Sequence, residues 1–225
     1  MIAIFFATEV EGRLFLKKLN NSEKTIIHGF TFIKGEISGI PLLVCFSGIG
    51  KISGAVSAVL AFEKFPVKKA IISGIAGAYP SSGLTVGEIA IADREIDADK
   101  GLLISCDDKD DSFIFMNNCE GVLLYIPDFL KNKKIGTFLT VSACTGNLNR
   151  AKFLEKKFNA ICENMEGAAI ANVAQIYKIP VSEIRSISNI ITDRKELLKI
   201  NNIKKCANIV QEFILENLPL IEGSP

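Results

Sequence analysis

The chain has 225 residues, of which 48% are hydrophobic and 23% charged, and its formal net charge is +1. This length and composition predict one globular domain spanning residues 1–225, and they exclude an intrinsically disordered chain. The near-zero charge, without any block of basic residues, argues against a nucleic acid or an anionic membrane as a partner.

The start of the chain and the cysteine usage indicate a cytoplasmic protein. Residues 1–7 are apolar but too short to cross a membrane, and no basic leader precedes them, so they predict a strand rather than a signal peptide. Six cysteines are scattered without a Cys-x-x-Cys pair, and His28 is the only histidine. This pattern favours reduced thiols and argues against a disulfide framework, a metal site or a His-based catalytic triad. We expect neither a metal nor a cofactor.

The first half of the chain alternates strands with helices. We expect strands at residues 2–7, 25–28, 30–36, 41–46 and 70–73, and helices at residues 11–19 and 52–62. A strand that leads at once into a helix is typical of α/β folds, in which ligands bind beyond the carboxyl ends of the strands. Glu9 and Glu11 lie at such an end, although either could simply stabilise the positive end of the helix dipole.

Two glycine-rich segments follow strands in this half. Residues 47–51, Ser-Gly-Ile-Gly-Lys, begin a helix whose backbone N–H groups could meet a ligand, but they lack the spacing of a P-loop. A tight strand-to-helix turn explains them equally well. Residues 74–78, Gly-Ile-Ala-Gly-Ala, follow a predicted strand and indicate a backbone that approaches another group closely.

The second half continues the same alternation. We expect strands at residues 88–92, 134–141, 160–163 and 181–188, and helices at residues 148–158, 165–178 and 198–218. Asn147 is a suitable N-cap for the first of these helices. Residues 93–118 are polar and irregular, which predicts a mobile lid or an insert.

The helix predicted from residue 165 is almost wholly small and apolar, yet Glu166 stands at its start. Such a helix is packed on most sides, and a buried carboxylate there needs partners. The helix N-terminus supplies some, which is the simpler explanation. However, the glycine and alanines that follow are small and leave room for a ligand. Because a carboxylate only accepts hydrogen bonds, the vicinal hydroxyls of a ribose suit Glu166.

Five segments, in order along almost the whole chain, resemble the purine nucleosidase and nucleoside phosphorylase superfamily. They are Ala-Thr-Glu-Val-Glu (7–11), Ser-Gly-Ile-Gly-Lys (47–51), Gly-Ile-Ala-Gly-Ala (74–78), Glu-Asn-Met-Glu-Gly-Ala-Ala (163–169) and Glu-Ile-Arg-Ser-Ile-Ser-Asn (183–189). Gly-Ile-Ala-Gly-Ala-Tyr-Pro, Thr-Val-Ser-Ala-Cys-Thr-Gly and Ile-Ser-Asn-x-x-x-Asp-Arg are most similar to the futalosine hydrolases, which remove hypoxanthine from futalosine in menaquinone biosynthesis. Methylthioadenosine/adenosylhomocysteine nucleosidases are also similar but usually have Asp where this chain has Asn189.

The resemblance implies a three-layer α/β/α sandwich around a mixed, partly barrel-like sheet, usually as a homo-oligomer, a dimer or larger. It implies cleavage of an N-ribosidic bond of a purine nucleoside, with Glu11 orienting or deprotonating the attacking water. Asn189 would contact N7 of the base and Glu166 the ribose hydroxyls. The remaining site residues that it implies are Met165 against the sugar, with Ala76, Gly77 and Ser188 around the substrate. No arginine stands near Ser47 or Gly74 in the sequence, which favours water over phosphate as the nucleophile.

The identity of residue 189 bears on which base leaves. The departing purine gains negative charge, and a group at N7 that relieves this charge lowers the barrier. Asn189 offers a donor to O6 of a 6-oxopurine and an acceptor for an N7–H, whereas an ionised Asp would face O6 lone pair to lone pair. We therefore expect a 6-oxopurine nucleoside, with futalosine first. Outside the family pattern, an Asn that caps the following turn would be the simpler explanation.

Other functions stay open. The nearest alternative is a methylthioadenosine/adenosylhomocysteine or aminodeoxyfutalosine nucleosidase, and a purine nucleoside phosphorylase or a non-catalytic nucleoside-binding protein ranks lower. The group on the ribose 5′ side is not specified by the sequence. Phe113, Phe115 or a neighbouring subunit could line a slot for it, and Asp193 and Arg194 could bind its carboxylate or pair with each other.

Overall fold

The computed structural model describes residues 1–103, 113–115, 120–192 and 200–224. Within these residues the strands are β1 (Ile2–Phe6), β2 (Asn20–Ile27), β3 (Phe30–Ile37), β4 (Ile40–Phe46), β5 (Lys69–Ala78), β6 (Ile89–Asp97), β7 (Gly101–Leu103), β8 (Phe113–Phe115), β9 (Val122–Leu123), β10 (Lys134–Thr140), β11 (Ala160–Asn164) and β12 (Val181–Ile190). The helices are α1 (Glu9–Lys18), α2 (Lys51–Lys64), α3 (Leu148–Phe158), α4 (Gly167–Ile176) and α5 (Ile200–Gly223), with a short 3-10 helix η1 (Asp128–Leu130).

One mixed sheet of ten strands organises the fold, in the order β11-β10-β6-β12-β5-β1-β4-β3-β2, with β9 added beside β6. Strand β11 also pairs with β5, antiparallel, so that β5, β12, β6, β10 and β11 close into a barrel. Strands β7 and β8 form a separate two-stranded sheet. The predicted mixed, partly barrel-like sheet is therefore confirmed.

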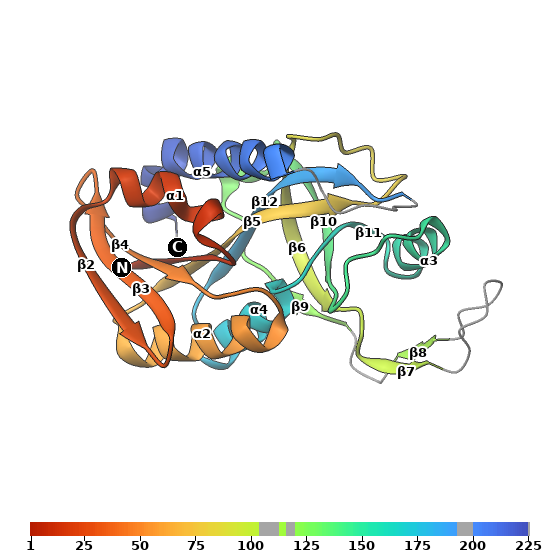
Figure 1. Cartoon of the computed structure of the whole chain (residues 1–225), viewed down its shortest axis with the longest axis horizontal. Helices are drawn as coiled ribbons and strands as arrows, with labels where there is room; N and C mark the ends of the chain where they lie inside the picture. The colour runs from red at the N-terminus through yellow and green to blue at the C-terminus, as the bar shows by residue number, and fades with distance from the viewer. Residues whose placement is uncertain (104–112, 116–119, 193–199, 225) are drawn as a thin grey trace.

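Strand β1 shows why the sheet needs a helical layer on each side. All five of its residues are buried, and side chains alternate between faces along a strand. Ala3 and Phe5 pack into one core, and Ile2, Ile4 and Phe6 pack into a second core. Helices α2 and α4 cover the first face, and α1 and α5 cover the other (Figure 1). This arrangement confirms the predicted three layers.

Strands β5 and β6 run further than the sequence pattern predicts. Strand β5 continues through the glycine-rich residues 74–78, and β6 extends to Asp97, into the segment expected to be irregular. The reason is pairing: β1, β12 and β11 supply hydrogen-bond partners along β5, and tertiary context of this kind overrides local preference. Residues 104–112 and 116–118 of the predicted lid lie outside the described residues.

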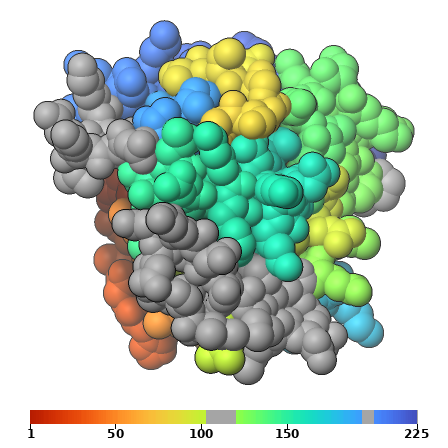
Figure 2. All heavy atoms as spheres, turned by 90° about the vertical axis from the view of Figure 1, so that its right-hand side faces the viewer, coloured from red at the N-terminus to blue at the C-terminus, as the bar shows by residue number. Residues whose placement is uncertain are grey.

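Helix α3 confirms its predicted bounds and its cap. The side chain of Asn147 accepts a hydrogen bond from Arg150 N, and the last helical residue is Phe158. Figure 2 shows α3 at the surface of one end of the molecule, beside the segment that joins β5 to β6. Ser81 N in that segment donates to Glu155 Oε1 of α3 at 2.8 Å. None of the described helices has the length and apolar character that crossing a membrane requires.

Candidate active site

A cleft of about 780 Å³, including its open mouth, lies where the ends of β1, β5, β11 and β12 meet the first turns of α1 and α4. Its lining comes from distant parts of the chain. The structure brings all seven of the predicted site residues to this cleft: Glu11, Ala76, Gly77, Met165, Glu166, Ser188 and Asn189.

Glu11 is held from two sides in the first turn of α1, which begins at Glu9, earlier than predicted. Its Oε2 accepts hydrogen bonds from Thr8 N and Thr8 Oγ1, both at 3.0 Å, and its Oε1 accepts one from Ile75 N at 3.2 Å. Burial raises the pKa of Glu11, the Arg185 guanidinium partly offsets this rise, and the Glu166 carboxylate adds to it. Glu11 is thus a fixed carboxylate with more basicity than an exposed one.

Glu166 occupies the N-cap position of α4, one residue before the helix begins at Gly167, rather than inside the helix as predicted. Its own carboxylate does not cap the helix. The N–H groups of Glu166 and Gly167 donate to Asn164 Oδ1 at 3.0 and 2.7 Å, and Ala168 N donates to Thr140 Oγ1 at 2.7 Å. The simpler explanation, in which Glu166 serves its own helix, is therefore wrong.

The Glu166 side chain instead points across to the glycine-rich turn before α2. Gly50 N donates to Glu166 Oε1 at 2.9 Å, and the backbone φ of Gly50 is 95°, a conformation that favours glycine. Residues 47–51 therefore do more than make a tight turn, because their backbone fixes one oxygen of the cleft carboxylate. The second oxygen, Oε2, lies 3.8 Å from Arg185 Nη2.

Asn189 lies near the end of β12, where it is paired in register with Gly77 of β5. Ser188 Oγ lies 2.9 Å from Asn189 Oδ1 and donates to it, and Ala76 O is a second acceptor for Ser188 at 3.1 Å. Asn189 Nδ2 is buried and has no partner among the described residues. A Cβ on Gly77 would come within 3.4 Å of this nitrogen, so the glycine keeps space beside an unused donor.

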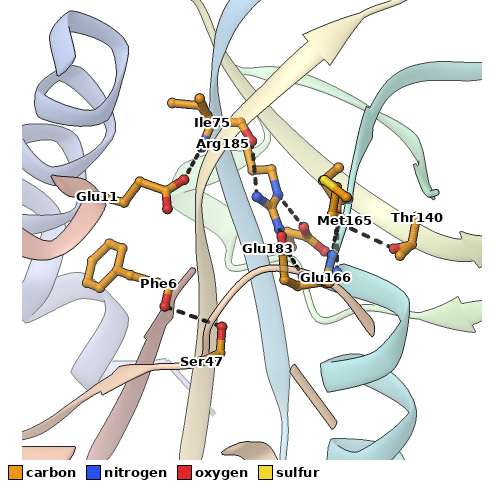
Figure 3. A network of polar contacts seen from close by, with 12 residues as sticks. Phe6, Glu11, Ser47, Ile75, Thr140, Met165, Glu166, Glu183 and Arg185 are labelled. Carbon is orange, nitrogen blue, oxygen red and sulfur yellow. Dashed lines mark hydrogen bonds and ion pairs between the residues drawn. The ribbon is translucent and has the colours of Figure 1, made fainter. Parts of the chain in front are cut away.

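Arg185 is a cleft residue that sequence reasoning missed. Strand β12 runs parallel to β5 and places Arg185 opposite Gly74. An arginine therefore does lie near Gly74 in the structure, although none stands near it in the sequence. Arg185 is 2% exposed, its Nη1 donates to Ile75 O at 3.1 Å, and its Nη2 lies 3.8 Å from Glu166 Oε2 (Figure 3). The available signal was a Glu-Ile-Arg sequence inside an otherwise buried strand.

The wall beside Met165 is fixed through Glu163. The Glu163 carboxylate accepts hydrogen bonds from Thr145 N at 2.7 Å, from Thr145 Oγ1 at 2.6 Å and from Tyr79 Oη at 3.1 Å. These bonds hold the segment after β10 against β11. On that segment Cys144 Sγ lies 3.5 Å from Met165 Sδ, so the two sulfur atoms form one soft face of the cleft.

Comparison with known proteins gives one consistent family. The sequence model of the phosphorylase superfamily matches residues 1–216. A 5′-methylthioadenosine/S-adenosylhomocysteine nucleosidase of Psychromonas ingrahamii is 28% identical and covers 96% of this chain and 99% of its own. The protein of the same name from Shewanella denitrificans is 31% identical, over 84% of this chain and 85% of its own.

Solved structures agree with this result at the level of the fold. The 5′-methylthioadenosine/S-adenosylhomocysteine nucleosidase of Neisseria meningitidis, bound to methylthio-immucillin-A, superposes with a TM-score of 0.81 at 19% identity, covering 96% of this chain and 97% of its own. An Asp-to-Asn variant of the Helicobacter pylori enzyme, with 5′-methylthioadenosine in the active site, gives 0.84 at 22% identity, covering 98% and 97%.

Proposed function

We propose that this chain, which belongs to the phosphorylase superfamily, is a purine nucleoside N-glycosidase of the methylthioadenosine/adenosylhomocysteine nucleosidase kind. The observation that carries the proposal is the meeting of Glu11, Glu166 and Asn189 in one cleft, although they come from the start, the middle and the end of the chain. The two acids suit a sugar and a water, and the amide suits a nucleobase edge.

In this mechanism Glu166 accepts hydrogen bonds from the 2′- and 3′-hydroxyls of the ribose, and Met165 packs against the sugar. As the N-ribosidic bond breaks, positive charge develops on the ribose, and the negative charge of Glu166 stabilises it. Glu11 takes the proton of the attacking water, a step that a positioned base accelerates by about 10²–10⁴-fold. Arg185 Nη1 and Glu11 Oε1 both lie beside Gly74, where they can orient that water.

The charge of the cleft favours water over phosphate. Of the described residues that line it, Arg185 is the one cation, whereas Glu11, Glu163 and Glu166 are carboxylates. Arg185 already lies between Glu183 at 2.5 Å and Glu166 at 3.8 Å. An incoming phosphate would therefore face like charges in a buried site. Base release that depends on phosphate would refute hydrolysis and favour the phosphorylase alternative.

The named relatives favour an adenine nucleoside such as 5′-methylthioadenosine or S-adenosylhomocysteine as the substrate, ahead of futalosine. Asn189 can serve adenine in the ground state, because its Nδ2 can donate to N7 and its Oδ1 can accept from the 6-amino group. An amide cannot, however, deliver a proton to N7 as a carboxylic acid can. Adenine would have to leave with only a hydrogen bond at N7.

A second candidate is a 6-oxopurine nucleoside, with futalosine first. The observation that favours it is that the Nδ2 donor of Asn189 is buried and unpartnered among the described residues, whereas its Oδ1 acceptor, which the 6-amino group of adenine would need, already accepts from Ser188 Oγ. This donor matches O6 of hypoxanthine, an acceptor in the place where adenine has an amino group. Leaving one buried polar group unpaired costs about 1–3 kcal/mol, which corresponds to about tenfold to over a hundredfold in preference.

One assay separates these candidates. Futalosine, inosine, aminodeoxyfutalosine, 5′-methylthioadenosine and S-adenosylhomocysteine are incubated with the protein side by side, and the released base is identified by liquid chromatography. Faster release of adenine refutes the 6-oxopurine candidate, and faster release of hypoxanthine refutes the adenine one. Release of no base, with or without phosphate, refutes the N-glycosidase proposal and would favour a nucleoside-binding protein.

The homo-oligomer and the single cytoplasmic domain of residues 1–225 stay predictions, and light scattering on the purified protein would test the first of them. The predictions for the 5′ substituent also stay open. Asp193 and Arg194 lie outside the described residues, as do the side chains of Phe113 and Phe115.

A further inference from the structure

Two carboxyl groups meet behind the cleft, at residues that the mechanism above does not use. Glu95 on β6 and Glu183 on β12 are both 0% exposed, and neither lines the cleft. Both point at the start of α4, where a Cβ on Gly167 would collide with an oxygen of each. Glycine at this position therefore allows the helix to approach two acids at once.

The contacts of Glu95 and Glu183 differ. Glu95 accepts hydrogen bonds from Thr140 Oγ1, at 2.8 Å, and from Asn164 Nδ2. Glu183 Oε1 accepts one from Arg185 Nε at 2.5 Å, while Glu183 Oε2 has no donor among the described residues. An ionised oxygen buried without a donor is costly, so a donor for Glu183 Oε2 is expected nearby.

A proton on Glu95 supplies that donor. Burial raises the pKa of both carboxyl groups; the adjacent charge of Glu183 raises that of Glu95 further, whereas the Arg185 guanidinium lowers that of Glu183. Glu183 is the member of the pair that faces a guanidinium, so the negative charge is more stable there. Protonated Glu95 can then donate to Glu183 Oε2, and one proton satisfies both side chains.

We propose that Glu183 is a positioning residue for the reaction: it stays ionised, accepts a hydrogen bond from protonated Glu95, and holds the Arg185 guanidinium in its cleft geometry. This inference rests on the proposed function. Arg185 is fixed at three points, by Glu183 at Nε, by Ile75 O at Nη1 and by Glu166 near Nη2 (Figure 3). Without the charge of Glu183, the buried cation has Glu166 as its remaining close counter-ion.

The expected consequence of losing Glu183 is a shift of Arg185 toward Glu166. Such a shift moves Nη1 away from the water beside Glu11, whereas the hydrogen bond from Gly50 N keeps Glu166 in place against the ribose hydroxyls. Misplacement by about 1 Å costs about 10²-fold in rate. The effect should fall mainly on kcat, because the pocket that binds the base does not change.

A matched pair of variants tests the assignment of the proton. Glu183→Gln removes the charge that faces Arg185, and we expect it to lower kcat by about 10²-fold with little change in KM. Glu95→Gln replaces a protonated acid by an amide of the same shape that can still donate to Glu183, so kcat should stay close to wild type. Wild-type kcat in Glu183→Gln, or equal losses in both variants, would overturn the proposal.

A double-mutant cycle tests whether Glu183 acts through Arg185. In an Arg185→Met background the Glu183 charge is buried and unpaired, so adding Glu183→Gln should raise the melting temperature and leave kcat unchanged. Independent, additive losses would overturn the proposal. The melting temperatures need no substrate, so the cycle tests this contact even if no base release is found. Glu183→Asp, which keeps the charge but is one methylene shorter, is a second variant expected to fold and to lose kcat.

Discussion

Gly74 is the position where one added methyl group should disable the cleft without replacing any reacting side chain. A Cβ built on Gly74 lies 2.5 Å from Glu11 Oε1 and 3.2 Å from Arg185 Nη1. An ordinary contact needs roughly 3.5 Å, so in Gly74→Ala the Glu11 carboxylate must move by about 1 Å. It cannot do so while keeping its three hydrogen bonds to Thr8 and Ile75.

The magnitude follows from this displacement. Moving the base by about 1 Å should cost about 10²-fold in kcat. The overpacking itself should cost about 1–3 kcal/mol of unfolding free energy. For a chain of this size each kcal/mol lowers the melting temperature by roughly 2–4 °C, so the variant should remain folded at 25 °C. Steady-state kinetics on the preferred nucleoside and thermal unfolding measure the two effects separately.

Gly39→Ala is the matched control. Gly39 also has a positive φ, +79°, but a Cβ there would meet no atom within 4 Å. The control should therefore lose stability through backbone strain, by about 1–2 kcal/mol, and keep its kcat. Wild-type kcat in Gly74→Ala, or an equal loss of kcat in Gly39→Ala, would refute the assignment of Glu11 and Arg185 to the water.

Three further substitutions and a pH profile test the remaining roles. Glu11→Gln should fold and lose about 10²–10⁴-fold in kcat, because an amide cannot take the proton, and near wild-type turnover would exclude Glu11 as the base. Glu166→Gln should raise KM and lower kcat, because the charge that both binds the hydroxyls and stabilises the cationic ribose is gone; an unchanged KM would contradict that role. Asn189→Asp should move the preference toward adenine by about tenfold to a hundredfold, measured as the ratio of kcat/KM for 5′-methylthioadenosine and futalosine, and an unchanged ratio would separate residue 189 from base choice. Burial raises the pKa of Glu11 and only its ionised form accepts a proton, so kcat/KM should fall as the pH drops through a midpoint above 4.5; a lower midpoint would contradict the assignment.

Local pattern and the family resemblance predicted much of the fold. Helix α3 has the predicted bounds and cap, because its apolar face and Asn147 are local signals. The seven proposed site residues do share one cleft, although their individual roles stay predictions. Strand β5 was predicted too short, because its glycines are weak strand formers alone and become strand through their neighbours.

The site residues that could not be predicted from the sequence are those whose positions depend on how the strands pair. Arg185 reaches the cleft because β12 pairs with β5 in parallel and sets it opposite Gly74, a fact that no local pattern contains. Glu95 lies in a stretch that appears polar and irregular in the sequence, whereas it forms the buried end of β6. Its proximity to Glu183 follows from the antiparallel pairing of β6 with β12. Charged residues within predicted buried strands do indicate that such partners exist. Which residues the partners are depends on the tertiary structure alone.

At the start of α4, residues that stabilise the helix stand beside a residue that takes part in the proposed reaction. Asn164 and Thr140 accept the hydrogen bonds of the first backbone amides of the helix, so the neighbouring acid at 166 is not needed to cap it. Its side chain instead contacts Gly50 and Arg185, on the cleft side. For the experimenter, substitutions at 166 should leave the helix cap in place, whereas substitutions at 164 should disturb the start of the helix itself.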